Sequence, residues 1–348
     1  MSNQLNAAAA MAQGLPPEAQ LAQLFMGAFV SQAVYVGAKL GLADLLVDGP
    51  LPVSELAAKT ETHERSLYRV MRTLSSVGVF AETDPKVFQN TPLSSLLVTE
   101  GPASMRYVAM WMGEEEHWRV YGHLLHSVKT GEPAWDKVHG EPVFPYMFQT
   151  NPALGDIFNK AMTSFSHQVV PELLGAYDFS GVKTVADIAG GHGHILAGVL
   201  QAYPEAHGVL FDLKPVLEGA RGLLESKGVA DRVTLQEGNF FEAVPVEADV
   251  YILKYIIHDW DDDKCVTILK NIRRVIPEGG RVVLLEAVVP EGNAPDFSKI
   301  IDMEMLLTPG GLERTAAEFG ELFERSGFKM SRIIPLNSPV SIVEAVAA

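Results

Sequence analysis

From Lys183 onward, short apolar runs alternate with helical patterns, and no other feature constrains the fold of this 348-residue chain as strongly. The strand patterns lie at 184–188, 207–212, 233–236, 249–253, 281–289, 331–335 and 341–346, and the helical patterns at 194–203, 215–227, 262–275 and 315–326. This alternation predicts parallel strands, right-handed crossovers and a doubly wound α/β sheet. Only residues 336–340 separate the last two strands, so we expect an antiparallel hairpin there.

The chain before about residue 178 is predicted to be mostly helical. Residues 21–42 form a long helical pattern that is apolar on more than one face, so it belongs either in a deep core or in a subunit interface. A short helix capped by Ser54, an amphipathic helix over 63–77 and a β-hairpin over 79–90 follow. A hairpin that follows three helices in this order indicates a winged helix.

A winged helix can bind DNA, and its presumed recognition helix carries Arg65, Arg69 and Arg72 on one face. The whole chain, however, has 27 basic and 43 acidic residues, which gives a net charge of −16. Phosphate binding needs a basic field, so this charge disfavours nucleic acid and anionic membranes as partners. We expect a structural module that pairs two subunits through its long apolar helix.

Composition excludes several further classes of protein. Hydrophobic residues make up 47% of the chain and charged residues 20%, which excludes a disordered protein. The single cysteine, Cys265, rules out an intrachain disulfide framework and a multi-cysteine zinc site. The first twenty residues lack the pattern of a signal peptide, and polar residues interrupt 21–47 too often for a membrane span. We therefore expect a soluble cytoplasmic protein.

A glycine-rich turn, Asp187 to Gly193, follows the first strand and opens a helix. Small residues there let the backbone approach a ligand, and the helix N-terminus offers free N–H groups. A dinucleotide fingerprint that begins at Gly191 would need a small residue where this chain has Leu196. With Ala189 in its first glycine position, the turn instead resembles the acid-x-G-x-G-x-G turn of class I methyltransferases, where Asp187 can engage the ammonium group of the ligand.

Two further loops lie where the ligand crevice of a doubly wound sheet is expected. Asp212 ends the second strand, where an acid can accept hydrogen bonds from two ribose hydroxyls. The alternative, that Asp212 caps the next helix, is compatible with this role. Asn239 and Phe240 follow the third strand and either bracket an adenine or form a turn followed by core aromatics.

The fourth strand ends in the stretch Lys254 to Trp260, at the edge of the sheet where sites are built in such folds. His258 is suited to proton transfer because imidazole titrates near neutral pH, and a structural histidine is the alternative. Asp259 and the acidic run Asp261 to Asp263 either bind Mg²⁺ or, as we expect, cap the helix that follows.

Two acidic residues lie farther along the chain. Glu286 falls inside an apolar run, where a carboxylate is costly unless it has a partner. Glu313 precedes a helix, and a salt bridge to Arg314 or another base is its structural alternative.

From about residue 20 onward, the chain resembles the plant-type small-molecule O-methyltransferases, of the caffeic acid and hydroxyindole kind, and their bacterial relatives in pigment and polyketide tailoring. The motifs that carry this resemblance are DIAGGHG at 187–193, FDL at 211–213, GNFF at 238–241, LKYIIHDWDDDKC at 253–265 and GGLERT at 310–315. It implies a Rossmann-like, doubly wound, seven-stranded methyltransferase sheet with an N-terminal, mostly helical winged-helix dimerisation domain. We expect that domain at 1–100, a helical linker that contributes to the acceptor pocket at 101–178, and the catalytic domain at 179–348.

The resemblance also implies roles for single residues. His258 would be the catalytic base, flanked by Glu286 and Glu313. Lys254 and Ser166 would hold the methionine carboxylate of S-adenosylmethionine. The full set expected at this cofactor is Ser166, Asp187, Gly190, Gly191, Gly193, Asp212, Leu213, Asn239, Phe240 and Lys254, and the set expected at the acceptor is Phe158, Met162, Tyr255, Asp259, Met303 and Met305.

Two positions depart from the family pattern. Asn239 stands where the family has an acid, which weakens any charged contact to adenine. His192 stands in the place of a threonine.

The expected reaction transfers a methyl group from S-adenosylmethionine to a hydroxyl of a small aromatic molecule and leaves S-adenosylhomocysteine. A phenol has a pKa near 10, so an imidazole that removes its proton accelerates the reaction, and no metal is required. The rival functions are a nicotinamide-dependent oxidoreductase on a similar sheet and a non-catalytic or transcription-regulating protein. Relatives that decarboxylate or hydroxylate on this scaffold leave a further activity open.

Overall fold

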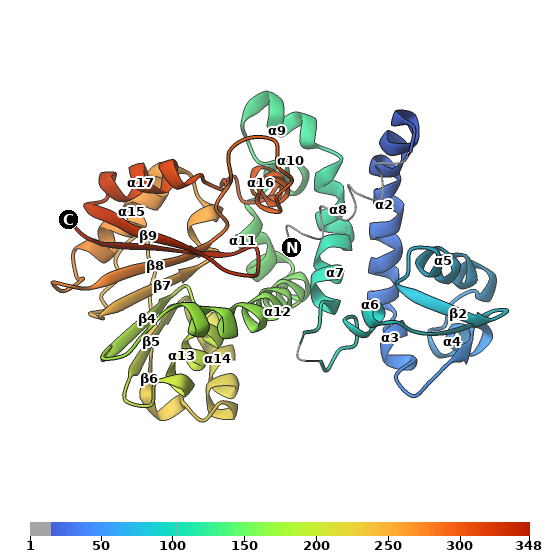
Figure 1. Ribbon diagram of the computed structural model, residues 1–348, viewed down its shortest axis with the longest axis horizontal. Coiled ribbons are helices and arrows are strands. Elements are labelled where there is room, and N and C mark those ends of the chain that lie inside the picture. The colour runs from blue at the N-terminus through green and yellow to red at the C-terminus, as the bar shows by residue number, and fades with distance from the viewer. Residues whose placement is uncertain (1–14, 102) are drawn as a thin grey trace. The chain divides into compact units, whose positions relative to one another are not determined.

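The computed structural model describes residues 15–101 and 103–348, which form two compact units (Figure 1). The N-terminal unit comprises residues 15–122 and 145–165, and the C-terminal unit comprises residues 123–144 and 166–348. The segment 101–178, expected to be a linker, is thus divided between both units.

The C-terminal unit contains a seven-stranded sheet with the order β6-β5-β4-β7-β8-β10-β9. Its strands are β4 (Thr184–Ile188), β5 (His207–Asp212), β6 (Val233–Glu237), β7 (Val250–Lys254), β8 (Arg281–Glu286), β9 (Phe328–Pro335) and β10 (Ser341–Ala347). The pairs among β4 to β8 are parallel, whereas β10 is antiparallel to β8 and to β9. The predicted doubly wound sheet and C-terminal hairpin are confirmed. β8 ends earlier than predicted, because Val288 pairs with Arg314 instead.

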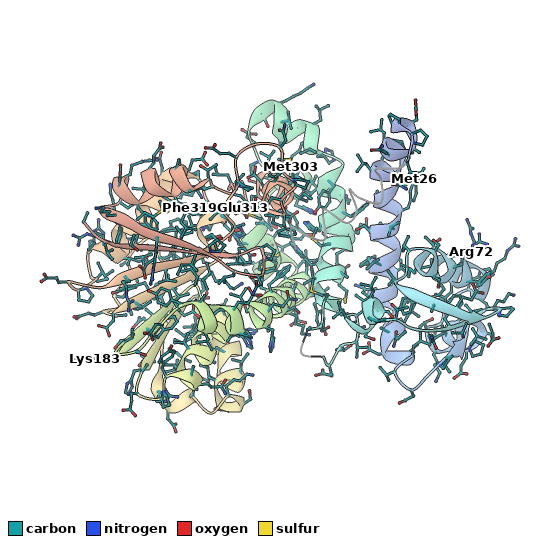
Figure 2. The ribbon with its side chains drawn as sticks, viewed as in Figure 1. Met26, Arg72, Lys183, Met303, Glu313 and Phe319 are labelled. Carbon is teal, nitrogen blue, oxygen red and sulfur yellow. The ribbon has the colours of Figure 1, made fainter. Side chains whose placement is uncertain are left out.

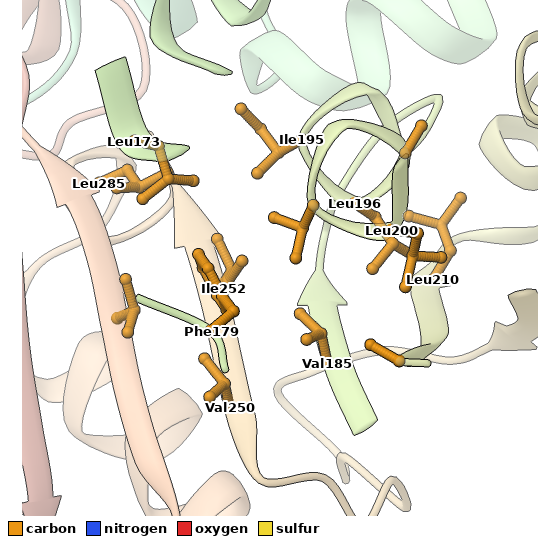
Figure 3. Packing of buried hydrophobic residues seen from close by; sticks show 14 of the residues in the cluster. Leu173, Phe179, Val185, Ile195, Leu196, Leu200, Leu210, Val250, Ile252 and Leu285 are labelled. Atoms are coloured by element: carbon orange, nitrogen blue, oxygen red, sulfur yellow. The ribbon is translucent and has the colours of Figure 1, made fainter. Parts of the chain in front are cut away.

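Helices cover both faces of this sheet (Figure 1). They are α13 (His194–Ala202), α14 (Lys214–Ser226), α15 (Asp262–Arg273) and α17 (Ala316–Arg325), with short turns η2 (Ala230–Arg232) and η3 (Ile257–Asp259) in the connections. Successive strand residues point to opposite faces, so Val185 packs in a core with α13 and α14, while Ala186 packs in a core with α15 and α17. Figure 3 shows the first core, where each fully buried aliphatic side chain contributes roughly 1.5–3 kcal/mol.

Further helices complete the C-terminal unit. They include α9 (Leu124–Thr130), α10 (Ala134–His139) and α16 (Ser298–Leu307), and α11 (Val143–Pro145) leads to the other unit. α16 packs against both α9 and α10.

The N-terminal unit has the element order expected of a winged helix. It contains α2 (Pro17–Lys39), α3 (Leu42–Leu45), β1 (Leu51–Pro52), α4 (Val53–Lys59), α5 (Glu64–Ser76), β2 (Phe80–Asp84), β3 (Val87–Asn90), α6 (Pro92–Ser95), α7 (Arg106–Gly113), α8 (Glu115–Tyr121) and η1 (Tyr146–Thr150). Its sheet has the antiparallel order β1-β3-β2. The prediction that Ser54 caps a helix is wrong, because α4 begins at Val53 and Pro52 is its N-cap.

α2 leaves most of its large apolar side chains exposed. Among the described residues of this helix, those that are buried are the small Ala33, Gly37 and Ala38. The exposed ones are Leu21, Leu24, Phe25, Met26 (Figure 2) and Phe29. The alternative that this helix belongs to a deep core is therefore wrong for the single chain. By length and composition, α2 is long and apolar enough to cross a membrane. The prediction that its polar residues exclude a membrane span is therefore wrong.

The helix predicted over 153–166 is longer in the structure, where α12 spans Pro152–Ala176. Asn151 acts as the expected start signal, since its Oδ1 accepts a hydrogen bond from the Leu154 N–H at 3.2 Å. The helix continues through Pro171, which removes one backbone donor, because Val169 and Leu173 are buried in the core of the C-terminal unit.

Candidate active site

The glycine-rich turn joins β4 to α13 and contains three residues with a left-handed backbone. The φ angles are +53° at Ala189, +60° at Gly191 and +77° at Gly193. Glycine adopts this conformation readily, whereas Ala189 bears roughly 1–2 kcal/mol of strain. Gly190 is required for space, because a Cβ at this position would lie 2.4 Å from Cγ of Asp187. The composition of the turn thus follows from its backbone geometry.

α13 lies close to the sheet even though Leu196 stands where a dinucleotide fingerprint has a small residue. The small residue is on the strand, since a Cβ added to Gly208 of β5 would lie 2.9 Å from Cδ1 of Leu196. Leu196 is fully buried in this contact. The turn therefore achieves close helix–strand packing without the fingerprint.

Two charged residues at the ends of the neighbouring strands β4 and β7 lack counter-charges in contact. Asp187 is buried, and its Oδ2 has no hydrogen-bond partner among the described residues. Burial raises the pKa of Asp187 to about 7. Lys254 forms no ion pair with any residue that the structure describes, and burial lowers its pKa to about 8. Such a pair is complementary to the ammonium and carboxylate groups of an amino-acid ligand.

Asp212, at the end of β5, is hydrogen-bonded to the glycine-rich turn. Its Oδ2 accepts a hydrogen bond from the Gly191 N–H at 2.8 Å, and its Oδ1 accepts one from the Leu213 N–H at 2.7 Å. Burial raises the pKa of Asp212 to about 6. The alternative that Asp212 caps α14 is wrong, because Leu213 is the N-cap residue and makes no side-chain cap.

The loop after β6 has the local structure of a turn followed by packed aromatic rings. Oδ1 of Asn239 accepts a hydrogen bond from the Phe241 N–H at 3.0 Å. The Phe240 ring lies 4.7 Å from the Phe241 ring and 6.2 Å from the Trp260 ring, measured between centroids. These contacts support the structural alternative for this loop, and contact with adenine stays a prediction.

His258 lies in η3, directly after β7, and is surrounded by three carboxylates. Its Nδ1 lies 2.7 Å from Oε1 of Glu313 and 3.9 Å from Oε2 of Glu286. Its Nε2 lies 3.5 Å from Oδ1 of Asp259. Glu313 therefore holds the proton on Nδ1 and leaves Nε2 as the nitrogen that can exchange a proton with a ligand. The alternative for Glu313 is a salt bridge to Arg314 or another base, and among the described residues its partner is His258, whereas Arg314 pairs with Asp262.

The carboxylates decide the protonation of His258. Burial alone would lower the pKa of the imidazole, but the charges of Glu286, Glu313 and Asp259 outweigh burial and raise it to about 10. Burial in turn raises the pKa of Glu286 to about 7 and that of Asp259 to about 6. The imidazolium form is thus strongly favoured in this cluster, which makes His258 an unusually strong base once it is neutral.

Tyr255 packs directly on this imidazole. The two rings are stacked, with centroids 4.9 Å apart and planes 17° apart. Its backbone has a φ of +52°, which for a bulky residue costs about 1–3 kcal/mol. The same ring also contacts Lys254, whose Nζ lies 4.8 Å from the Tyr255 ring centroid. Tyr255 therefore contacts both His258 and Lys254.

The acidic run after His258 is used in the structure of α15. Asp261 is the N-cap and accepts a hydrogen bond from the Lys264 N–H at 2.9 Å, as expected. Asp262 pairs with Arg314, and Asp263 with Arg325. A different group, His258 with Glu286 and Glu313, has ligand atoms within 4.8 Å of one another, but Glu286 Oε1 already accepts the N–H groups of Ile256 and Ile257.

The residues expected at the acceptor fall in different places. Tyr255 and Asp259 contact His258, as described above. Met303 (Figure 2) and Met305 lie on α16, the first exposed and the second buried. The remaining two are on the part of α12 in the N-terminal unit. The Phe158 ring packs edge-on against the Trp111 ring, with centroids 5.1 Å apart, and Met162 lies one turn farther along the helix.

Sequence reasoning missed Asp302, also on α16. Its Oδ1 accepts a hydrogen bond from the Glu313 N–H at 2.8 Å and so helps to fix the acid that binds His258. No local pattern marks Asp302, because its role depends on a contact with a loop outside its own helix.

Comparisons with known proteins agree with this geometry. The family model for the O-methyltransferase domain matches residues 121–329, and the model for the O-methyltransferase dimerisation domain matches residues 22–100. The chain is 45% identical to the phenazine O-methyltransferase PhzM of Lysobacter antibioticus over 334 residues, which is 96% of this chain and 97% of that protein.

Solved structures show the same similarity. The crystal structure of LaPhzM superposes with a TM-score of 0.92 at 45% identity and covers 96% of this chain and 100% of that one. The structure of human N-acetylserotonin methyltransferase in complex with S-adenosylmethionine has a TM-score of 0.88 at 26% identity, covering 96% and 99% of the two chains. The chain therefore belongs to the O-methyltransferase family and is an S-adenosylmethionine-dependent methyltransferase with an N-terminal dimerisation domain.

Proposed function

We propose that this enzyme methylates a hydroxyl group of a small, polycyclic or monocyclic aromatic acceptor and that His258 is the base. The observation that carries this proposal is the fixed orientation of His258. Its Nδ1 lies 2.7 Å from Oε1 of Glu313, whereas Asp259, the nearest described carboxylate to Nε2, is 3.5 Å away. Relatives named for phenazine and N-acetylserotonin support an aromatic acceptor. Relatives named for phenazine and for mitomycin biosynthesis further support a role in secondary metabolism.

We further propose which residues hold the cofactor. Asp187 would bind the ammonium group, Lys254 with Ser166 the carboxylate, and Asp212 the ribose hydroxyls. Among the described residues, Oδ2 of Asp187 has no hydrogen-bond partner and Lys254 forms no ion pair, which supports the first two assignments. The turn supplies the space through Gly190, Gly191 and Gly193, while Leu213, Asn239 and Phe240 would face the nucleoside. When bound, S-adenosylmethionine supplies an electrophilic methyl group on a positively charged sulfur.

The acids around His258 determine how it acts. A phenol has a pKa near 10, and the carboxylates raise the pKa of His258 far above that of a free imidazole, so neutral Nε2 is a stronger base toward a phenolic acceptor than a free imidazole. Glu313 and Glu286 then stabilise the imidazolium, as the buried acid does in a hydrolase triad. The stacked Tyr255 keeps the ring in plane while the proton moves. Positioned general-base catalysis of this kind contributes roughly 10²–10⁴-fold.

The acceptor would lie against Tyr255, Asp259, Met303 and Met305 in the C-terminal unit, and Phe158 and Met162 stay predicted pocket residues of α12. Two apolar methionines adapt their shape to flat ligands. An aromatic acceptor is therefore the class that this lining favours.

We also propose that the enzyme is a cytoplasmic homodimer that pairs through a winged-helix N-terminal domain. The exposed apolar side chains of α2, from Leu21 to Phe29, form a patch that a monomer in water would not favour. The dimerisation-domain match covers most of this helix. Sedimentation of the purified chain tests the assembly, and a monomer at micromolar concentration would contradict it.

The experiment that tests the reaction combines binding with product analysis. Calorimetry should show binding of S-adenosylhomocysteine and none of NAD, and hydroxylated phenazines and simple phenols should take up label from methyl-labelled S-adenosylmethionine. A carboxylated acceptor that loses CO₂, or one that gains oxygen, without taking up label would instead favour the decarboxylase or hydroxylase alternative. Binding of S-adenosylhomocysteine with no chemistry on any acceptor would favour a regulatory protein.

A further inference from the structure

Arg314 is a buried cation that the reaction described above does not use. Its side chain is 1% exposed, and it is among the largest fully buried side chains of the chain. A buried guanidinium is costly unless its donors are satisfied, so its contacts show what the fold holds in place with it.

The guanidinium spans the backbone on either side of the catalytic histidine. Nη1 donates to the carbonyl of Ile257 at 3.0 Å, and Nη2 donates to the carbonyl of Trp260 at 2.9 Å. These two residues flank the His258–Asp259 pair. Arg314 therefore binds both ends of η3, the turn that presents the imidazole.

Asp262 is the counter-ion that completes this arrangement. Its Oδ1 accepts hydrogen bonds from Nε of Arg314 at 3.0 Å and from Nη2 at 2.7 Å. Asp262 lies in the first turn of α15, so it connects the guanidinium to the helix that follows η3. Cys265, one turn later, donates from Sγ to the Ile257 carbonyl at 3.2 Å, the same oxygen that accepts from Nη1 of Arg314.

Arg314 also follows Glu313 directly in sequence, so its anchoring acts on both partners of the catalytic pair. The Leu312 N–H donates to the His258 carbonyl at 2.9 Å, and the Val289 N–H donates to the Arg314 carbonyl at 2.9 Å. Gly311 allows this contact, because a Cβ there would lie 1.9 Å from the His258 carbonyl oxygen. The loop that carries Glu313 is thus fastened to the loop that carries His258.

We propose that Arg314, with Asp262 as its counter-ion, is a positioning residue for methyl transfer: it fixes η3 so that Nδ1 of His258 stays on Oε1 of Glu313. The inference rests on the proposed role of His258 as the base. Asp262 is half-exposed and has a second, weaker contact to Arg325, so it can be changed without opening the core.

The test compares Asp262→Asn with Asp263→Asn, the same change at the neighbouring position of α15. Asp263 pairs with Arg325 on the surface and does not contact Arg314, which makes it a matched control. Asp262→Asn should lower kcat about tenfold at an unchanged KM for S-adenosylmethionine, and Asp263→Asn should not. Arg314→Lys keeps the charge but loses the planar fork, so it should fold and yet show the same loss of kcat.

Two measurements separate positioning from a general loss of structure. The His258 imidazole signals, followed by NMR in the intact protein, should titrate at lower pH in Asp262→Asn, because contact with Glu313 is weakened while Glu286 and Asp259 remain. In a His258→Ala background, Asp262→Asn should have no further effect on kcat.

The outcomes are distinguishable. If His258→Ala keeps its turnover, the base assignment fails, whatever Asp262 does. If His258→Ala is inactive but Asp262→Asn and Arg314→Lys both keep kcat and the imidazole titration of the unaltered enzyme, the positioning role is refuted. Equal losses of kcat from Asp262→Asn with and without His258 would refute it as well.

Discussion

Replacing Glu313 with glutamine is the change that most directly probes the charge around His258. Glutamine keeps an oxygen in reach of Nδ1 but removes the negative charge that lies 2.7 Å away. Glu286 and Asp259 remain, the first at 3.9 Å from Nδ1 and the second at 3.5 Å from Nε2. The variant therefore isolates one of three charges without creating a cavity.

The expected magnitude follows from the strength of one charge-assisted hydrogen bond. Such a bond contributes roughly 1.5–3 kcal/mol, and one pKa unit corresponds to about 1.4 kcal/mol. The pKa of His258, about 10 in the unaltered enzyme, should thus fall by roughly one to two units. The three acids favour the protonated ring, so removing one lets the neutral base form at lower pH.

The assay is the dependence of kcat/KM on pH, measured between about pH 6 and 10.5 with a phenolic acceptor. In the unaltered enzyme kcat/KM should rise with pH as His258 loses its proton. In Glu313→Gln this rise should move to lower pH by one to two units, and the plateau should fall roughly tenfold to a hundredfold, because the imidazolium is less stabilised.

Glu318→Gln is the control. Glu318 is exposed and accepts a hydrogen bond from the Thr315 N–H at 2.7 Å in the capping box of α17, so its loss changes a helix end and not the imidazole. A profile of Glu313→Gln with an unmoved midpoint, or one shifted to higher pH, would refute the electrostatic reasoning.

Three further changes test other parts of the site. His258→Ala should reduce turnover about 10²-fold or more while calorimetry shows unchanged S-adenosylhomocysteine affinity; undiminished turnover would contradict its role as base. Lys254→Met should weaken S-adenosylhomocysteine binding roughly tenfold to a hundredfold in the same measurement, and equal affinity would argue against its contact with the carboxylate. Ala189→Gly should raise the thermal midpoint, because the left-handed φ of +53° costs alanine roughly 1–2 kcal/mol, and a lowered midpoint would show that this strain is absent.

Those parts of the fold that depend on local periodicity could be predicted from the sequence. The apolar runs of β4 and β8 are short and lie between helical patterns, and this is enough to specify a parallel sheet. The position of His258 follows from the same logic, because it comes directly after a buried strand at the edge where ligands bind.

Features that depend on distant contacts could not be predicted. α12 continues past its predicted end because its last turns are buried against a sheet formed later in the chain. A salt bridge from Arg314 to its neighbour Glu313 is one alternative that the sequence offers, whereas the fold brings Asp262 to Arg314 from 52 positions away. The left-handed backbone at Tyr255 has no sequence signal, since bulky residues rarely adopt it.

Leu196 of α13 packs directly on Gly208 of β5, although the dinucleotide fingerprint considers the helix position alone. The large side chain is on the helix and the strand position has no side chain, so the volumes that fit at 196 and 208 depend on each other. Leu196→Ala alone would leave a void next to β5 and cost about 2–5 kcal/mol, without producing a dinucleotide turn. A small residue at 196 would therefore need a larger residue at 208 if the helix is to keep its contact with the strand.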